Sequence, residues 1–323
     1  MASGEHPTGR RRPASTAPRV TPSRGERPTA TERAALGHRF TVVTDVPGLQ
    51  GYLGELFASL DPGDTPSRAS DHREATPATY TLRAEPGSQG RTASLWRDET
   101  LLCDPSPTAH AVALLLWDLN QQAVVRSPHL VRVHAAALAD HGHGLVLAAP
   151  MEGGKTTLAA ALVEAGFAYL SDEIAAFDPA TLALRAYPKP LSVDPGSWAA
   201  LAHLEPHVDP DLAPLLPRQW QLPAQAIRPG AVTATADPRL VLVIRYDPDT
   251  DAAPQRLPRS KAVAHLARST FELDRNPDRD LSALADIVRR CDCYTLAVGD
   301  LARACAEITA LLPSDPATAE APP

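Results

Sequence analysis

Residues 145–157 read Leu-Val-Leu-Ala-Ala-Pro-Met-Glu-Gly-Gly-Lys-Thr-Thr. The apolar run at the start of this stretch is typical of a buried strand, and the glycine pair is typical of a tight turn into a helix. A strand that turns through glycines into a helix, with a lysine at the turn, is the layout of a phosphate-binding P-loop. Backbone N–H groups and the positive end of the helix dipole would surround phosphates there. The sequence therefore predicts a nucleotide site made by Gly153, Gly154, Lys155, Thr156 and Thr157.

The loop departs from the full P-loop pattern at two positions. Glycine is usual six residues before the lysine, where this chain has Ala149, and is often found three before it, where the chain has Glu152. We expect Ala149 to fit only with a negative φ. The Glu152 carboxylate should turn outward or meet a metal, because it would otherwise repel phosphates. The alternative is an ordinary strand–turn–helix connection with an exposed lysine.

Two carboxylates follow the predicted helix. Tyr169-Leu-Ser-Asp172-Glu173 ends the next predicted strand, with Asp172 lying 17 residues after Lys155. Metal-assisted phosphoryl transfer needs a lysine on the outer phosphates, oxygen ligands for Mg²⁺ and a base near the acceptor hydroxyl. We therefore expect Lys155 to hold the β and γ phosphates, Thr156 and Asp172 to bind Mg²⁺, and Glu173 to accept the proton. The two acids could exchange roles, and the alternative for the pair is a cap at the strand end.

Two further residues are candidates for this site. His134 lies in the predicted strand 130–138, which a short turn joins to the loop strand 144–149, so an antiparallel hairpin is expected. His134 could then face the acids, although a buried histidine bonded to a backbone carbonyl is the alternative. Lys189 stands between two prolines in a rigid turn and could steady a phosphate or an acidic substrate. A solvated lysine is the alternative there.

Composition limits the class of protein. The chain has 323 residues with 44% apolar content, enough for a full core in one large domain or two small ones. A formal charge of −7 argues against a nucleic-acid partner. No apolar run reaches the length of a membrane span and no secretion signal is evident, so we expect a cytoplasmic protein without a membrane partner. The cysteines have no zinc-binding spacing and are expected to be packing thiols: Cys103, Cys291, Cys293 and Cys305.

The chain divides into four predicted parts. Residues 1–38 are rich in Arg, Pro, Ser and Thr and should form a disordered basic tail, and residues 314–323 a second disordered tail. Residues 39–127 are predicted to be a small α+β domain with helices at 49–60 and 107–125 and strands at 40–44, 80–83, 94–97 and 99–102. Residues 128–313 are predicted to be the nucleotide-binding domain.

The nucleotide-binding domain is expected to alternate strands with helices. Beyond the loop, helices are predicted at 156–165, 260–267, 281–290 and 300–312. Strands are predicted at 167–170, 240–246 and 293–298, with a hairpin of 174–177 and 182–187. Residues 193–237 are proline-rich and should be irregular.

These motifs, taken in order, resemble the HPr kinase/phosphorylase family, which shares its P-loop architecture with phosphoenolpyruvate carboxykinase. The resemblance covers about residues 128–313. It rests on Val133-His134-Ala135, on Gly154-Lys155-Thr156-Thr157-Leu158, on a helix closed by Gly166, and on Leu170-Ser-Asp172-Glu173. Tyr187-Pro-Lys-Pro-Leu191 and Tyr294-Thr-Leu296 make the chain similar to a bacterial HPr-kinase-like subgroup. The family usually has two aspartates where this chain has Asp172-Glu173.

The resemblance implies an α/β fold (α+β, with a mixed sheet) built on a P-loop kinase core that uses ATP and Mg²⁺. The implied reaction transfers the γ-phosphoryl group to a hydroxyl of a protein, a peptide or a small molecule. Two alternatives stay open. Ala149 and Glu152 would suit an inactive nucleotide-binding regulatory module, and the family's chemistry also runs in reverse, as a phosphorylase. A homo-oligomer is also left open.

Overall fold

The computed structural model describes residues 31–60, 76–150, 152–250 and 253–312. Within these residues the fold is mixed α/β, with mixed sheets and seven α-helices. Of the predicted tails, residues 1–30 and 314–323 lie outside the described residues.

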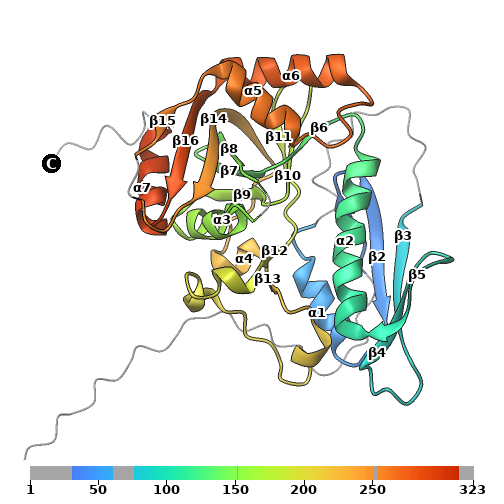
Figure 1. Ribbon diagram of the computed structural model, residues 1–323. Coiled ribbons are helices and arrows are strands. Elements are labelled where there is room, and N and C mark those ends of the chain that lie inside the picture. The colour runs from blue at the N-terminus through green and yellow to red at the C-terminus, as the bar shows by residue number, and fades with distance from the viewer. Residues whose placement is uncertain (1–30, 61–75, 151, 251–252, 313–323) are drawn as a thin grey trace, which may run out of the picture.

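The first sheet has five strands in chain order (Figure 1). These are β1 (Arg33–Ala35), β2 (His38–Thr44), β3 (Ala78–Ala84), β4 (Thr92–Arg97) and β5 (Thr100–Pro107). Strands β2 and β3 run parallel, and the other neighbours are antiparallel. Helices α1 (Leu49–Leu56) and α2 (Thr108–Arg126) share one hydrophobic core with this sheet, around Phe40 and Tyr80.

Ordered structure begins earlier than the sequence analysis predicted. Strand β1 and the first residue of β2 lie inside the segment 1–38 that was expected to be disordered. Ala35 pairs with His38, and both residues are buried. The prediction failed because a three-residue strand has too few apolar positions to give a periodic signal. Its order comes from pairing with β2.

The second sheet carries the strand before the glycine loop. Its strands lie in the order β6 (Val131–His134), β10 (Ile174–Phe177), β11 (Leu184–Arg185), β14 (Thr235–Tyr246), β8 (His143–Ala148), β7 (Ala136–Asp140) and β9 (Ala168–Ser171). Strand β14 also pairs with β16 (Asp292–Val298), which pairs in turn with β15 (Gln255–Arg256). Strands β8, β14 and β16 are parallel, so their carboxyl ends lie at one edge of the sheet.

The hairpin that leads into the loop is confirmed. Strands β7 and β8 are antiparallel, with Ala136 opposite Leu147 and Asp140 opposite His143. The single predicted strand 130–138 is wrong, because the chain breaks at Ala135 into β6 and β7. Strand β6 pairs with β10, whereas β7 pairs with β8 and β9.

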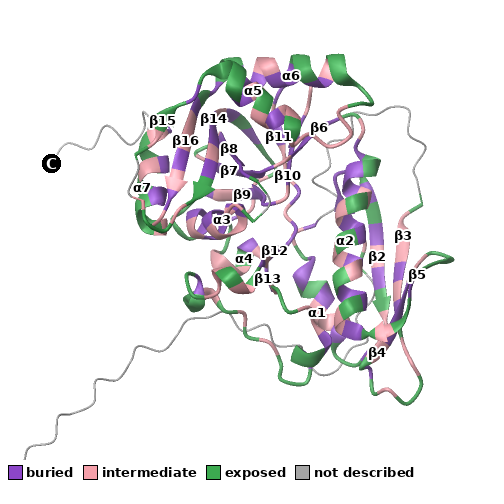
Figure 2. Ribbon diagram, in the orientation of Figure 1, coloured by how far each residue is buried: buried purple, intermediate pink, exposed green. Residues whose placement is uncertain are grey.

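Helices cover both faces of the second sheet. Helices α3 (Lys155–Glu164) and α7 (Leu301–Leu311) lie on one face, and α5 (Arg259–Arg268) and α6 (Pro277–Arg290) lie on the other (Figure 1). Along β8, Leu145 and Leu147 pack toward α3 and α7, while Val146 and Ala148 pack toward α5 and α6. The strand is therefore buried on both faces, as is typical of parallel strands between helical layers, and the outer faces of α5 and α6 are exposed (Figure 2).

The proline-rich stretch holds more structure than expected. Three short 3₁₀-helices lie at 195–197, 202–204 and 213–215. Strand β13 (Trp220–Leu222) pairs with β12 (Leu191–Val193), and it is followed by α4 (Ala224–Ile227). The prediction that all of residues 193–237 are irregular is therefore wrong, because β13 forms by pairing with a strand about thirty residues earlier, with Ser192 opposite Gln221.

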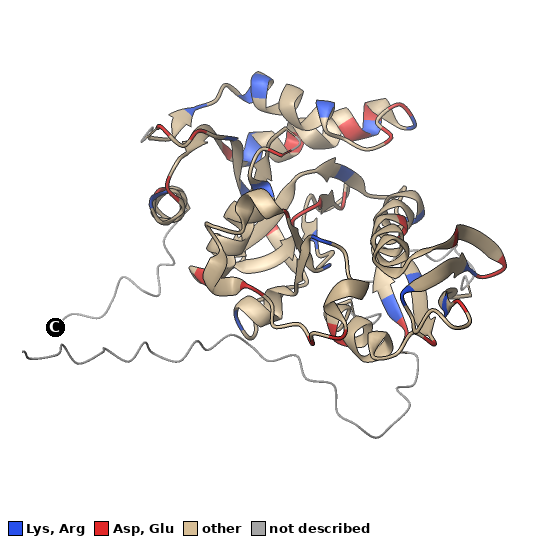
Figure 3. Cartoon of the chain, turned by 60° about the horizontal axis from the view of Figure 1, so that its bottom comes forward, with Lys and Arg blue, Asp and Glu red and all other residues tan. Residues whose placement is uncertain are grey.

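The surface of the described residues carries both signs of charge. Lys, Arg, Asp and Glu are interspersed over both parts of the fold (Figure 3). None of the helices in the described ranges combines the length and the apolar character needed to cross a membrane.

Candidate functional site

The glycine loop joins the carboxyl end of β8 to the first residue of α3, Lys155. Gly154 caps the helix with a φ of +85°, which is in the left-handed region that glycine adopts without a steric penalty. A Cβ on Gly153 would lie 2.8 Å from the Ala149 Cβ and 2.9 Å from the Pro150 carbonyl oxygen. Both glycines are therefore required by the geometry of the loop.

The two positions that depart from the glycine pattern are accommodated differently. Ala149 is buried and does not have a positive φ, as the sequence analysis required. Glu152 has a φ of +59°, in the left-handed region where a side chain costs about 1 kcal/mol or more. Its side chain is exposed. The carboxylate therefore turns toward solvent rather than into the loop.

Lys155 is buried at the start of α3, with 7% of its surface exposed. Its Nζ lies 3.2 Å from the Ala149 carbonyl oxygen and 3.2 Å from the Pro150 carbonyl oxygen. Burial lowers the pKa of Lys155, and the nearby Glu173 and Asp172 carboxylates partly offset this effect. The alternative of an exposed lysine is therefore wrong, and the ammonium is held by the loop itself.

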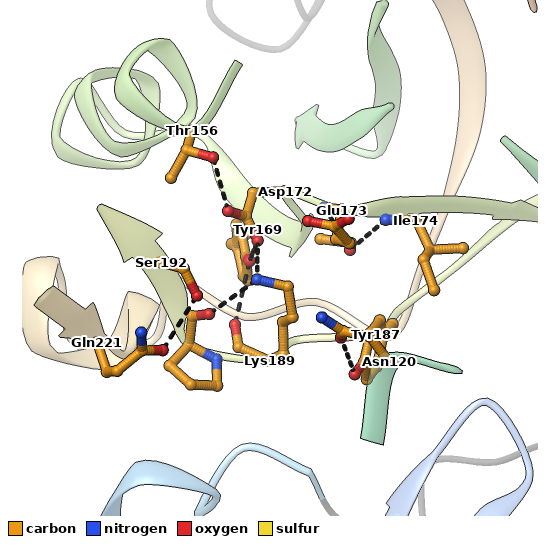
Figure 4. A network of polar contacts seen from close by, with 12 residues as sticks. Asn120, Thr156, Tyr169, Asp172, Glu173, Ile174, Tyr187, Lys189, Ser192 and Gln221 are labelled. Carbon is orange, nitrogen blue, oxygen red and sulfur yellow. Dashed lines mark hydrogen bonds and ion pairs between the residues drawn. The ribbon is translucent and has the colours of Figure 1, made fainter. Parts of the chain in front are cut away.

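Asp172 lies at the centre of a buried polar network (Figure 4). Thr156 Oγ1 donates a 2.9 Å hydrogen bond to Oδ2 of Asp172. The Tyr169 hydroxyl donates to Oδ1 at 2.9 Å, and the Lys189 ammonium lies 2.9 Å from the same oxygen. The first turn of α3 and the end of β9 are thereby joined through one carboxylate.

Lys189 is the site residue whose burial the sequence analysis missed. It is only 6% exposed, so the alternative of a solvated lysine is wrong. Besides Asp172, its ammonium contacts the Pro190 carbonyl oxygen at 3.1 Å. The only signal in the sequence was the pair of flanking prolines, which fixes the backbone but does not say which way the side chain points.

Glu173 and His134 form a second, more open pair. His134 is opposite Ile174 in the β6–β10 register, which brings its Nδ1 to 3.8 Å from Oε1 of Glu173. The two side chains are 30% and 34% exposed. Burial lowers the pKa of His134, and the negative charge of Glu173 acts in the opposite direction. His134 does face one of the acids, as predicted.

The backbone around the acids is fixed by Ser171. Its hydroxyl oxygen accepts hydrogen bonds from the N–H groups of Glu173 and Ile174, at 3.2 and 3.0 Å. Ser171 is fully buried on β9. A short serine cap of this kind orients the Glu173 side chain, and the sequence gives no periodic signal for it.

Thr157, a predicted phosphate contact, has a hydrogen-bond partner that belongs neither to the glycine loop nor to the pair of acids. Its Oγ1 lies 2.6 Å from the Ser197 hydroxyl. Ser197 belongs to the first 3₁₀-helix after β12. The hydroxyl of Thr157 therefore connects α3 to the segment that follows β12.

The oxygen atoms at Thr156 and Asp172 fit a magnesium ion by their chemistry. Mg²⁺ takes hard oxygen ligands, keeps several waters and uses one or two protein carboxylates together with substrate phosphates. Within the described ranges, no three His, Cys, Asp or Glu side chains are arranged to hold a metal ion. A metal at this site would thus depend on oxygens supplied by a bound phosphate.

Comparisons with known proteins do not assign the chain to a protein family. No protein-family model matches it, and no curated protein matches it. The similarity of its motifs to the HPr kinase/phosphorylase family therefore stays a prediction.

Proposed function

We propose that this protein binds ATP with Mg²⁺ and transfers the γ-phosphoryl group to a hydroxyl of a protein, a peptide or a small molecule. The observation that carries the proposal is the 2.9 Å hydrogen bond between Thr156 and Asp172. It brings together the first helical turn after a glycine loop and a carboxylate at the end of a neighbouring strand. A P-loop core like that of HPr kinase would account for this arrangement.

In this proposal the loop binds the phosphates. The N–H group at Gly154, together with the start of α3, would face the phosphate oxygens. The N–H group of Gly153 donates instead to the Pro150 carbonyl oxygen at 3.1 Å and keeps the loop in its turn. Lys155 exchanges its contacts with the Ala149 and Pro150 carbonyl oxygens for contacts with the outer phosphates. Thr156 and Asp172 would hold Mg²⁺, which would supply positive charge to neutralise the phosphate oxygens.

Glu173 is the proposed base. Its carboxylate is half-buried, is adjacent to Asp172 and has its backbone fixed by Ser171. It takes the proton from the acceptor hydroxyl as the new bond from acceptor oxygen to phosphorus forms. The bond from the γ phosphorus to the bridging oxygen breaks, and ADP leaves with that electron pair. His134, 3.8 Å from Glu173, orients the carboxylate.

One set of observations favours a second candidate, a nucleotide-binding module without transfer activity. The Asp172 carboxylate already accepts contacts from three donor groups. Glu152 has a left-handed backbone conformation that glycine would adopt without strain. A loop that has lost part of its glycine pattern can keep a nucleotide while positioning it poorly for reaction.

The experiment that tests the proposal measures binding and transfer separately. ATP binding with Mg²⁺ is followed by calorimetry, and transfer by the appearance of label from γ-labelled ATP in candidate acceptors or in water. Lys155→Ala should abolish both. Lys261→Ala, at an exposed lysine on α5, is the matched control and should change neither. Absence of ATP binding by the unaltered chain would refute the proposal, whereas binding without transfer to any acceptor would favour the module.

A further inference from the structure

The three lysines of this chain are distributed unevenly. Among 31 Lys and Arg residues, only Lys155, Lys189 and Lys261 are lysine. Lys261 is exposed, whereas the other two are buried in the candidate site. An arginine side chain carries a planar, delocalised fork, and a lysine carries a compact point charge on a flexible stem. Both buried lysines of the candidate site therefore carry a compact ammonium group on a flexible side chain.

The backbone at Lys189 is fixed from several sides. Proline flanks it at 188 and 190, and the Tyr169 hydroxyl lies 3.1 Å from its carbonyl oxygen. Its side chain is buried, and the ammonium contacts Asp172 and the Pro190 carbonyl oxygen. These contacts use two of the three donors of an ammonium. Because the backbone is fixed, a change in the contacts of the ammonium would have to come from rotation of the flexible lysine stem.

The positive and negative side chains of the candidate site are equal in number. Lys155 and Lys189 are positive, and Asp172 and Glu173 are negative. A divalent cation that entered alone would leave two uncompensated positive charges among buried groups, where repulsion is weakly screened. A cation that arrives with a nucleotide triphosphate brings its own negative charge. The metal and the nucleotide should therefore enter together.

We propose that Lys189 makes metal binding conditional on the nucleotide. Without a nucleotide its ammonium would stay on Asp172 and oppose a metal ion there. With a nucleotide bound, Asp172 would become available to the metal, and the ammonium would turn to the phosphate oxygens. The inference rests on the proposed function, since it requires that phosphates bind beside Thr156 and Asp172. Lys189 is then a positioning residue that couples metal binding to nucleotide binding.

The test uses Mn²⁺ as a paramagnetic probe of the metal site in the intact chain. Free Mn²⁺ is measured by electron paramagnetic resonance, with and without the non-hydrolysable analogue AMP-PNP. For the unaltered chain, AMP-PNP should raise Mn²⁺ affinity by about tenfold or more, within the usual range of coupling between two sites. Lys189→Met should bind Mn²⁺ about tenfold more tightly than the unaltered chain when no nucleotide is present.

Two control variants separate charge from packing. Lys189→Arg keeps the positive charge and should keep Mn²⁺ binding weak without nucleotide. Lys261→Met removes an exposed lysine charge and should behave as the unaltered chain does. A thermal melt checks that Lys189→Met is folded, because it leaves the charge of Asp172 buried without its cation. If it does not fold, Lys189→Gln replaces it, because the neutral amide can still donate to Asp172, and it should show the same tighter Mn²⁺ binding without nucleotide. A titration of AMP-PNP alone gives the Mn²⁺ that the analogue binds in solution.

The outcomes distinguish this inference from the proposed function. If the unaltered chain binds AMP-PNP but its Mn²⁺ affinity does not respond to the nucleotide, the role of Lys189 is refuted and the nucleotide site stands. Equal Mn²⁺ affinity of Lys189→Met and the unaltered chain would refute that role too. If AMP-PNP does not bind at all, both the proposed function and the role of Lys189 are refuted.

Discussion

The Tyr187 hydroxyl donates a 2.6 Å hydrogen bond to Oδ1 of Asn120. Asn120 lies on α2, beside the first sheet, and Tyr187 lies two residues before Lys189. Tyr187 is buried in the hydrophobic core that α2 shares with the first sheet, together with Ile174 and Ala176 from the second sheet. One continuous core and one hydrogen bond thus connect the first part of the fold to the candidate site (Figure 4).

Tyr187→Phe should lower the free energy of unfolding by about 1–2 kcal/mol, because it leaves the Asn120 oxygen without its donor inside the fold. Urea denaturation measures this difference. Tyr246→Phe removes the same hydroxyl from a tyrosine that is 59% exposed and is the matched control. Equal stability of the two variants would show that the contact between Tyr187 and Asn120 contributes nothing to folding.

Glu173→Gln should keep ATP binding and lose phosphoryl transfer by a factor of about 100 or more, the usual contribution of a positioned base. The amide preserves the shape of the side chain and its place beside His134, but it cannot take up the proton. Single-turnover transfer and calorimetric binding are measured on the same preparation. Glu99→Gln, in the exposed turn between β4 and β5, serves as the control. Full transfer by Glu173→Gln would remove Glu173 from the role of base.

Glu152→Gln should tighten ATP binding by about two- to fivefold, the scale of one exposed charge interaction. The carboxylate lies in the loop that would hold the phosphates, and the amide removes its negative charge while keeping its size. Glu152→Gly removes both the charge and the left-handed strain, so it should bind at least as tightly as Glu152→Gln. Weaker binding by both variants would mean that Glu152 takes part in holding the ligand.

The free energy of unfolding should fall in acid because of His38. Burial, aided by the positive charge of Arg126, lowers the pKa of His38 from 6.5 to about 4 in the folded chain. The unfolded chain therefore takes up this proton at a higher pH than the folded chain does. The contribution of His38 is present in full above pH ~6.5 and is lost as the pH falls toward ~4, by about 3 kcal/mol in total.

Thermal or urea melts between pH 4 and 7 measure this dependence on acid. His38→Gln should flatten the slope, whereas His110→Gln, at an exposed position on α2, should not. An unchanged slope in His38→Gln would assign the loss of stability in acid to other groups.

Local features of the candidate site could be predicted from the sequence. Two short apolar strands around a tight turn indicated the hairpin of β7 and β8, and the glycine pair indicated a sharp bend before α3. These features depend on residues within a few positions of each other. The order of the strand, the loop and the acids along the chain was enough to place Thr156 near Asp172 before the fold was known.

Features that depend on distant pairing could not be predicted. The run from Leu130 to Leu138 is apolar apart from Arg132 and His134, and nothing in its pattern shows that β6 and β7 have different partners. The burial of Lys189 requires Tyr169, which lies on β9, and Asp172, which directly follows this strand, both roughly twenty residues earlier in the chain. Hydrophobic periodicity indicates which face of an element is buried, but it does not identify the element that covers this face.

Tyr169 limits how Asp172 can bind a metal ion. Burial raises the pKa of Tyr169 well above its usual range, and the negative charge of Asp172 adds to this effect, so the phenol keeps its proton wherever the chain is folded. Its hydroxyl points at Oδ1, which leaves Oδ2, the oxygen that faces Thr156, as the more open side of the carboxylate. If a metal ion binds there as proposed, Asp172 would offer it a single oxygen, a monodentate geometry that suits the small octahedral shell of Mg²⁺ better than the larger shell of Ca²⁺.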